Sequence, residues 1–280
     1  MFLSLEKVFA KFISYGNGTI LDESDIIEYL GRDKDTKVIC LYVEAIKDGR
    51  KFMRIMKEVS KKKPIIAIKG GITEEGSKAT LSHTGSLAGS AEVYFGIFKQ
   101  VGIIHAASLE EMINIASIFE KSIKPKGNRI QVITNGGGYG ILSTDAISLN
   151  KKLRMAQLSK DTVRGLTLKF PDIVTIGNPM DLVGDATTRR YRIAIDYCMD
   201  DSNIDIILLI VLYQTPLLST DIVEIISEYN DYQKKPIIVV STGGQFTEVL
   251  RSALAKNNVV TYTFPEEAVK AIAALVEYYH

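Results

Sequence analysis

The run from Val38 to Val43 reads V-I-C-L-Y-V, and Glu44 follows it directly. Six apolar residues in succession indicate a strand that is buried on both faces, as strands are in parallel sheets. Helical patterns separate this run from others like it, so strands and helices alternate along the chain. The alternation predicts the α/β class, with parallel sheets covered by helices. The other runs of this kind are Pro64–Ile68, Arg129–Thr134, Ile204–Leu212 and Pro236–Ser241.

A polar stretch near the middle of the chain divides it. Lys124–Asn128 reads K-P-K-G-N and interrupts both the strand and the helix periodicity. A length of 280 residues also suits two domains better than one. We therefore expect one domain over residues 1–124 and a second over residues 125–280, each a flavodoxin-like, doubly wound parallel sheet. Ligands of such sheets bind beyond the carboxyl ends of the strands.

Composition and charge exclude several classes of function. The formal net charge of +1 gives no reason to expect a nucleic acid or an anionic membrane as partner. No uncharged apolar run reaches the roughly 18 residues of a membrane span. Cys40 and Cys198 lie in apolar surroundings, which favours reduced thiols and the cytoplasm, and with three scattered histidines they form no metal site. The lack of tryptophan and the abundance of Ile, Lys and Glu are traits also found in thermophile proteins.

The stretch from Leu81 to Ser90 reads L-S-H-T-G-S-L-A-G-S and places His83 among small residues. We expect a polar loop over Ile72–Ser82, with Ser86 as the N-cap of a helix that runs from Leu87 to Val101. Free amides at that helix start would favour an anion beside the ring. This suggests that His83 is a nucleophile that is phosphorylated on nitrogen. The alternative is an N-cap loop with an incidental exposed histidine.

Several polar and glycine residues come directly after predicted strands, and parallel strands gather such residues at one edge of the sheet. A short strand at Lys11–Tyr15 is part of this expectation. Glu44 is the chemically notable member, because its carboxylate can hydrogen-bond one ring nitrogen of His83 and leave the other free to attack phosphorus. The alternative is a solvated glutamate at a strand end. The residues gathered in the first domain are Gly16, Asn17, Glu44, Lys69, Gly70 and Gly71.

The second domain has a glycine-rich turn between a strand and a helix. Glycines let a phosphate approach backbone amides, and the helix start adds a favourable dipole. The turn is neither a Walker loop nor a dinucleotide fingerprint, and a tight turn without a ligand is the alternative. Asn178 and Asp181 fall at the same predicted edge, although the residues after them also suit capping of the next helix. The turn comprises Asn135, Gly136, Gly137 and Gly138.

Six motifs, taken in order, resemble those of the NDP-forming acyl-CoA synthetases, relatives of succinyl-CoA synthetase that are common in archaea. Together they cover nearly the whole chain. The motifs are K-F-I-S-Y-G-N from Lys11, Y-V-E-A-I-K-D-G-R-K-F from Tyr42, K-K-K-P-I-I-A-I-K-G-G from Lys61, S-H-T-G-S-L-A-G-S from Ser82, I-T-N-G-G-G-Y-G from Ile133 and G-N-P-M-D-L-V-G-D-A from Gly177.

The resemblance implies a reaction in which acyl-CoA, phosphate and ADP give free acid, CoA and ATP. It implies that His83 carries the phosphoryl group, that Glu44 stabilises it, and that Asn135–Gly138 opens a helix facing the phosphorylated ring. The first domain is similar to the family's histidine-bearing ligase domain, and the second to its partner domain. CoA and ADP or ATP with Mg would be substrates of the complete enzyme, and we expect no tightly bound cofactor.

Two parts of the family pattern are not recognised in the 280 residues: a CoA-binding Rossmann domain and an ATP-grasp domain. We therefore expect a subunit or fragment that acts with an ATP-grasp chain and a CoA-binding chain, on a small carboxylic acid and phosphate, as an oligomer. The first sheet should also lack a strand, which leaves an edge open to pairing. Whether the chain is an enzyme by itself stays open. The alternative is a non-catalytic remnant or regulatory module of the same fold that binds a nucleotide, CoA or a partner protein.

Overall fold

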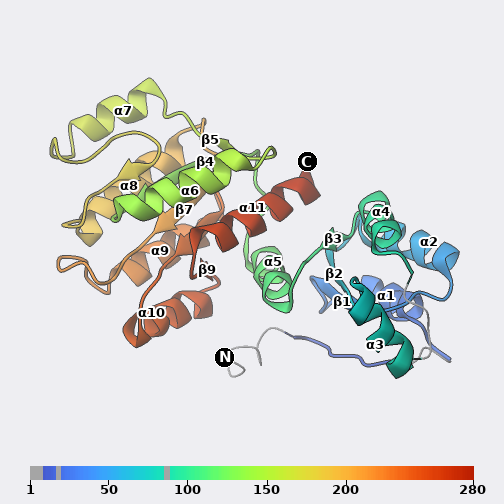
Figure 1. Cartoon of the computed structure of the whole chain (residues 1–280). Coiled ribbons are helices and arrows are strands. Elements are labelled where there is room, and N and C mark those ends of the chain that lie inside the picture. Colours follow the sequence, from blue (N-terminus) through green and yellow to red (C-terminus); the bar gives the residue numbers. More distant parts are fainter. Residues whose placement is uncertain (1–8, 17–19, 85–88) are drawn as a thin grey trace. The chain divides into compact units, whose positions relative to one another are not determined.

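The computed structural model describes residues 9–16, 20–84 and 89–280, with the backbone alone for residues 83 and 84. These residues form two compact units that divide between Glu120 and Lys121. In Figure 1 the first unit runs from blue to green and the second from green to red.

The first unit is a parallel sheet accompanied by helices. Its strands lie side by side in the order β1-β2-β3, as the last three strands of the flavodoxin order do. In the described part of the chain β1 pairs only with β2, and Lys11–Tyr15 forms no strand, contrary to expectation. The elements are α1 (Glu23–Arg32), β1 (Ile39–Val43), α2 (Gly49–Val59), β2 (Ile65–Lys69), α3 (Glu74–Thr84), α4 (Ala91–Val101), β3 (Ile104–His105) and α5 (Leu109–Lys121).

Strand β1 is buried on one face only, so the expectation of burial on both faces is wrong. Ile39, Leu41 and Val43 are buried and pack with α1, α2 and α4 in one apolar cluster. Tyr42, on the other face, is 53% exposed. The aromatic ring of Tyr42 counts as apolar in the sequence, whereas its hydroxyl favours a solvent-exposed position at the strand end.

The segment before His83 is helical, which contradicts the predicted loop over Ile72–Ser82. Helix α3 begins after Thr73, whose hydroxyl accepts a hydrogen bond from the Gly76 amide (3.1 Å). His83 lies in its last turn. The next helix, α4, begins at Ala91 rather than Leu87, and Ser90 is its N-cap residue. The predicted N-cap, Ser86, lies outside the described residues.

The second unit contains a six-stranded parallel sheet. Its main path is β5-β4-β7-β8-β9, and β6 pairs with the end of β4. Counted along the chain without β6, this is the order 2-1-3-4-5, which confirms the flavodoxin-like topology. The elements are β4 (Arg129–Thr134), α6 (Gly137–Leu149), β5 (Arg154–Met155), α7 (Lys160–Thr167), β6 (Met180–Asp181), α8 (Thr188–Asp200), β7 (Ile206–Ile210), α9 (Ile222–Asp231), β8 (Ile237–Val240), α10 (Gln245–Lys256), β9 (Val260–Tyr262) and α11 (Pro265–Tyr279).

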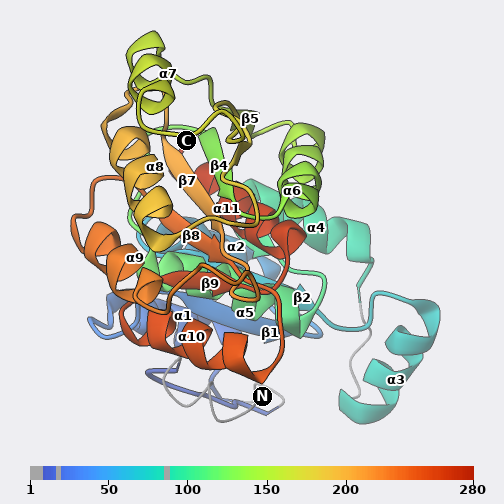
Figure 2. The same ribbon diagram turned by 90° about the vertical axis from the view of Figure 1, so that its left-hand side faces the viewer.

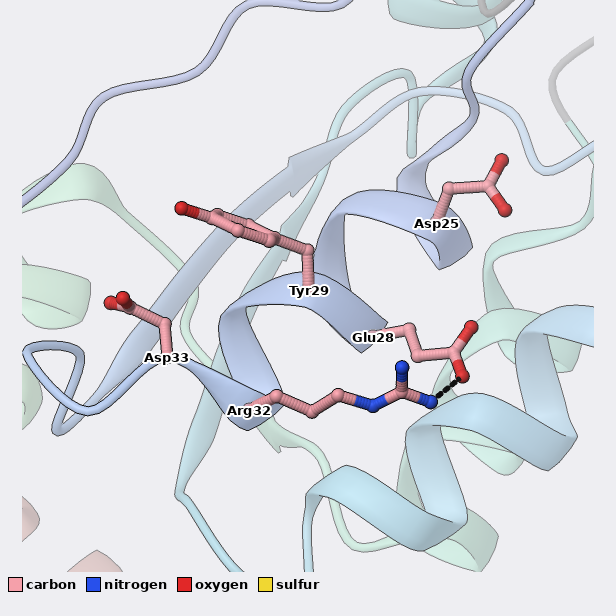
Figure 3. A pocket seen from close by; sticks show the side chains of 5 residues that line it. All are labelled: Asp25, Glu28, Tyr29, Arg32 and Asp33. Carbon is pink, nitrogen blue, oxygen red and sulfur yellow. Dashed lines mark hydrogen bonds and ion pairs between the residues drawn. The ribbon is translucent and has the colours of Figure 1, made fainter.

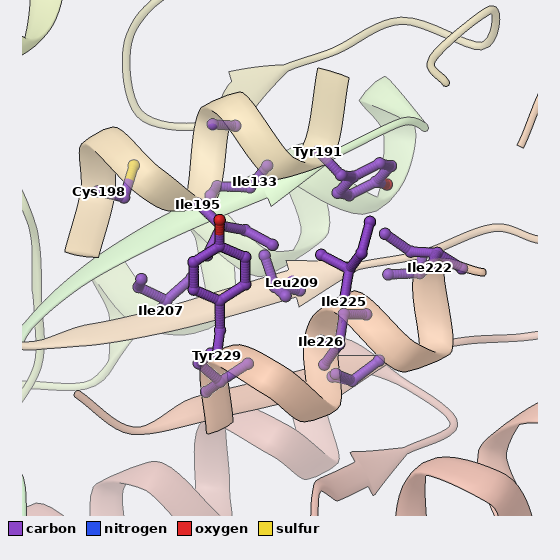
Figure 4. Close-up of a cluster of buried hydrophobic side chains, with 14 of the residues drawn as sticks. Ile133, Tyr191, Ile195, Cys198, Ile207, Leu209, Ile222, Ile225, Ile226 and Tyr229 are labelled. Atoms are coloured by element: carbon purple, nitrogen blue, oxygen red, sulfur yellow. The ribbon is translucent and has the colours of Figure 1, made fainter. Parts of the chain in front are cut away.

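Helices cover both faces of the second sheet. Figure 2 shows α8 and α9 on one side of the strands and α6 and α11 on the other. Every residue of β7 is fully buried, as its continuous apolar run predicted. Figure 4 shows one face of this core, where Ile207 and Leu209 of β7 meet Ile195 of α8 and Ile226 of α9. The double covering explains why these strands read as unbroken apolar runs.

Candidate functional site

In the first unit, the ends of two neighbouring strands bring the predicted residues together. Val43 of β1 lies opposite Lys69 of β2 in the parallel register, and the Gly70 amide donates to the Val43 carbonyl (2.9 Å). Glu44 therefore leaves β1 beside the Lys69-Gly70 turn. The site is built by the sheet edge itself, as expected for parallel strands.

The Glu44 carboxylate is only partly satisfied. Its Oε1 accepts a hydrogen bond from the Tyr42 hydroxyl (3.1 Å). Its Oε2 is buried, and no described residue donates to it. A Cβ on Gly70 would lie 2.5 Å from the Tyr42 hydroxyl oxygen and 3.3 Å from Glu44 Cγ, so a larger residue there would have to displace the end of the Tyr42 side chain. The arrangement leaves one carboxylate oxygen free to accept a further donor.

Lys69 is buried at the end of β2, with only 3% of its surface exposed. Its ammonium donates to the Gly70 carbonyl and lies 4.7 Å from the centre of the Tyr94 ring on α4. Burial lowers the pKa of Lys69, and the negative charge of Glu44 acts in the opposite direction. Tyr94 is held in place because its hydroxyl accepts a hydrogen bond from the Ile46 amide (2.9 Å).

The remaining predicted residues of the first unit are placed less completely. The side chain of His83, and all of Asn17 and Ser86, lie outside the described residues. Gly16 and Gly71 both have positive φ angles, +59° and +70°, which glycine adopts at little cost. Both therefore serve as turn glycines.

Asn135 fastens the glycine-rich turn of the second unit to the end of β7. The residue is 2% exposed. Its amide nitrogen donates to the Leu212 carbonyl and the Thr215 hydroxyl (both 3.0 Å), and its Oδ1 accepts from the Leu212 amide (2.9 Å). These bonds use both ends of the side-chain amide. Asn135 thus shapes the turn instead of offering its side chain to a ligand.

The three glycines that follow differ from one another. Gly136 precedes α6, and a Cβ on it would lie 2.5 Å from Leu212 Cδ1. A Cβ on Gly137 would lie 2.9 Å from Asp181 Oδ2, whereas no atom lies within 4 Å of one on Gly138. In the described part of the chain, no acceptor is present for the Gly137 and Gly138 amides. A helix start with free amides can receive an anion on its open side.

Asn178 and Asp181 serve the local backbone. The Asn178 amide donates to the carbonyls of Ile130 (2.7 Å) and Ala156 (3.0 Å), and its Oδ1 accepts from the Val132 amide (3.0 Å). The side chain thereby fills the gap between the places where β5 and β6 pair with β4. Asp181 Oδ1 accepts from the Val183 amide (2.9 Å).

Sequence reasoning missed the parts that Tyr42 and Tyr94 play at the first site. Alternation offers a signal for Tyr42, because residues two apart on a strand share a face and Glu44 comes two residues later. No local sequence feature indicates a role for Tyr94. It lies on α4, 48 residues after Ile46, whose amide donates to the Tyr94 hydroxyl.

The hollow in Figure 3 lies elsewhere. It has a volume of about 320 Å³ and is lined by Asp25, Glu28, Tyr29, Arg32 and Asp33, on α1 or directly after it. None of the residues predicted for the site belongs to it. In residues 9–16, 20–84 and 89–280, no helix has the length and apolarity needed to cross a membrane, and no three acidic, His or Cys side chains are grouped to hold a metal ion.

Comparison with protein families identifies both units. Residues 3–119 match the succinyl-CoA ligase like flavodoxin domain, and residues 130–280 match the Ligase-CoA domain.

Curated relatives and a solved structure agree with these matches. The alpha subunit of an ADP-forming acetate–CoA ligase II from Pyrococcus furiosus is 38% identical over 275 residues, which are 96% of this chain and 59% of that subunit. An ADP-forming acetate–CoA ligase from Methanocaldococcus jannaschii is 39% identical over 96% of this chain and 39% of its own length. The dinucleotide forming acetyl-coenzyme A synthetase 1 of Ca. Korarchaeum cryptofilum, solved with phosphate and ADP, superposes with a TM-score of 0.87 at 32% identity, over 95% of this chain and 58% of that one. The chain thus spans about three fifths, or less, of these relatives.

Proposed function

We propose that this chain is the histidine-bearing part of an ADP-forming acyl-CoA synthetase. The premise is that the chain belongs to the Ligase-CoA family and carries a succinyl-CoA ligase like domain before its Ligase-CoA domain. The observation that carries the proposal is the order of the two domains over one chain, together with relatives named as ADP-forming acetate–CoA ligases. Because the chain covers only 59% of the Pyrococcus alpha subunit, the complete activity needs further parts.

The proposed reaction has three transfers. A phosphate oxygen attacks the thioester carbonyl of acyl-CoA, the carbon–sulfur bond breaks, and CoA leaves as the thiol. A ring nitrogen of His83 then attacks phosphorus in the acyl phosphate, and the free carboxylate leaves. Finally a terminal oxygen of ADP attacks the phosphorus on nitrogen, which gives ATP and restores the imidazole.

The described geometry supports specific roles for the first unit. Glu44 has one buried oxygen free to accept a ring N–H of His83, which would fix the tautomer and favour the cationic phosphorylated ring. Gly70 leaves the space beside this carboxylate free of a side chain of its own. We propose Glu44 and His83 as the catalytic pair.

In the second unit, we propose that backbone amides contact the phosphoryl group. The Gly137 and Gly138 amides open α6, a helix of 13 residues, and the position of Gly138 is unobstructed. Asn135 holds the turn in shape, whereas Asn178 and Asp181 bind the backbone near it.

Substrates and partners follow from the proposed reaction. CoA, phosphate and ADP or ATP are the substrates, and Mg enters with the nucleotide. An ATP-grasp chain and a CoA-binding Rossmann domain would supply the nucleotide and CoA sites, in an oligomer that works in the cytoplasm. The relative from Ca. Korarchaeum cryptofilum, solved with phosphate and ADP, supports the nucleotide and phosphate assignment.

Transfer of labelled phosphate tests the proposal. The chain is combined with an ATP-grasp partner chain and ATP labelled in the γ position, and we expect an acid-labile, base-stable phosphohistidine that His83→Ala abolishes. His105→Gln is the matched control, since His105 packs against Phe95 with ring centroids 4.3 Å apart and should leave the label unchanged. Equal labelling of the His83→Ala variant would show that the carrier is another residue.

A further inference from the structure

Asp181 has one carboxylate oxygen that receives no hydrogen bond from the residues that the structure describes. The residue ends β6, and the parallel register places it opposite Thr134 at the end of β4. Its Oδ1 accepts a hydrogen bond from the Val183 amide (2.9 Å), which fixes the orientation of the carboxylate. No described donor reaches its Oδ2, and no described lysine or arginine pairs with it. One acceptor of fixed direction is therefore left over.

This free oxygen lies beside the start of α6. It is 2.9 Å from the point where a Cβ on Gly137 would lie. Because the Cα–Cβ bonds of a helix tilt toward its amino end, an atom next to the Cβ position of the first residue lies near the free amides. Gly137 and Gly138 carry two amides for which the described part of the chain has no acceptor. A side chain at position 137 would have to displace the carboxylate oxygen, so glycine keeps the acceptor and the amides together.

The donors and the acceptor in this group match an anion that still carries a hydrogen. Amide N–H groups donate to anionic oxygens, whereas an ionised carboxylate can only accept. An anion without a hydrogen therefore meets a like charge and has nothing to donate. A phosphate that keeps one P–OH can donate that hydroxyl to the carboxylate in a charge-assisted hydrogen bond. Near neutral pH inorganic phosphate carries at least one such hydroxyl, and sulfate carries none.

We propose that Asp181 makes the start of α6 selective for protonated phosphate. The amides of Gly137 and Gly138 bind anionic oxygens of the phosphate, and Asp181 Oδ2 accepts the hydrogen of its P–OH. Asp181 is then the residue that distinguishes phosphate from sulfate. The inference rests on the proposed function, in which phosphate is a substrate and α6 contacts the phosphoryl group, and it adds the side chain that recognises the free anion.

Amide NMR of the whole chain tests the selectivity. The isotope-labelled chain is titrated at neutral pH and equal ionic strength with phosphate, arsenate or sulfate, and the Gly137 and Gly138 peaks are followed. We expect phosphate and arsenate, which both carry a hydroxyl, to shift these peaks at concentrations about tenfold lower than sulfate does, because an unpaired charged acceptor weakens binding by roughly this factor. Equal responses to phosphate and sulfate, or no response to phosphate, would overturn the inference.

Asp181→Asn removes the charge at this position and leaves the shape of the side chain unchanged. Its amide oxygen can still accept from the Val183 amide, and its NH₂ group replaces Oδ2 with a donor. We expect its affinities for phosphate and sulfate to agree within about threefold, because either anion can then accept from the side chain. Asp185→Asn is the matched control, since Asp185 pairs with Arg190 and should keep the preference of the parent. A tenfold preference for phosphate in Asp181→Asn would mean that the carboxylate only stabilises the helix start.

Two outcomes separate this inference from the proposed function. If the parent protein selects phosphate but takes no label in the phosphohistidine assay, the proposed function fails and the selectivity stands. If the parent takes the label while its Gly137 and Gly138 amides respond equally to phosphate and sulfate, the proposed function stands and the role of Asp181 is refuted.

Discussion

At the scale of single residues, the site depends on where side chains are missing as much as on where they are present. Gly70 lies between Tyr42 and Glu44, and the space for a Cβ there is already taken up by both of them. The Tyr42 hydroxyl can therefore reach the carboxylate, and the second carboxylate oxygen stays free.

Gly70→Ala is expected to displace Glu44 and to slow phosphohistidine formation by roughly tenfold to a hundredfold, the range for small misplacements of a reacting group. The free energy of unfolding should fall by only about 1 kcal/mol, because the end of the exposed Tyr42 side chain can move aside. Gly49→Ala is the matched control, since no atom lies within 4 Å of a Cβ there and it opens α2. The rate of phosphohistidine labelling and the urea unfolding curve, measured side by side for the two variants, test this prediction. Unchanged labelling in Gly70→Ala would mean that the position of Glu44 is unimportant.

Residue roles were the least predictable part of the site. Glu44 could be singled out because a carboxylate after a buried strand reaches the ligand edge. Asn135 was expected to meet phosphate, and its bonds to Leu212 and Thr215 could not be foreseen, since those residues are 77 and 80 positions away. A polar side chain at a turn looks the same in sequence whether its partner is a ligand or the backbone.

At the scale of helices and strands, the sequence predicted best where burial is complete. Strand β7 and its neighbours are covered on both faces, and their apolar runs therefore matched their bounds closely. Helix α3 was missed because it has almost no apolar stripe. It is held by local polar contacts instead, including the Thr73 cap and a Glu74–Lys78 ion pair (2.7 Å) one turn apart. Spacing of this kind is a signal that a search for apolar periodicity passes over.

Helix α8 and strand β8 are joined by one buried lysine. Lys235, before β8, is 7% exposed and donates to the Cys198 (2.8 Å) and Asp201 carbonyls at the end of α8. Burial lowers its pKa from 10.5 to about 8. Between these values the unfolded chain binds more protons than the folded protein, so this group makes stability rise with pH from about 8 toward 10.5.

Lys235→Met should remove that pH dependence. From about pH 7.5 to pH 9.5 we expect the parent's free energy of unfolding to rise relative to the variant's by about 1–2 kcal/mol. Urea melts of both proteins at the two pH values measure the difference. The comparison also cancels most of the opposite effect of Cys198, whose thiol has its pKa raised to about 12 by burial. Parallel pH profiles for parent and variant would show that the lysine titrates as it does in water.

At the scale of the whole molecule, the chain is built as two units with separate cores. The apolar cluster of the first unit draws its buried members from Ile27 to Ile103, and the cluster around β7 draws its members from Ile133 to Val259. No residue is shared between them. The two-domain division was predictable because the polar stretch after α5 interrupts both periodicities, whereas the strand order of each sheet rested on the general rule for α/β folds.

We expect the segment 121–280 to fold by itself, because its six strands and their helices contain an apolar core of their own. Its urea midpoint should match the second of two transitions in the whole chain, and its amide NMR spectrum should overlay on the corresponding peaks of that chain. Circular dichroism and a two-dimensional NMR spectrum give the readout. A disordered segment, with a single transition in the parent, would mean that the two cores depend on each other.

Asn178 has a further consequence for chemical ageing. Heat deamidates asparagine when the next backbone nitrogen attacks the side-chain amide, and that nitrogen must carry a hydrogen. The next residue here is Pro179, whose nitrogen has none. Hydrolysis would turn a donor into a carboxylate that faces the Ile130 and Ala156 carbonyls, and the edge of β4 would loosen. The edge of β4 is thus held by an amide whose usual route of deamidation is closed.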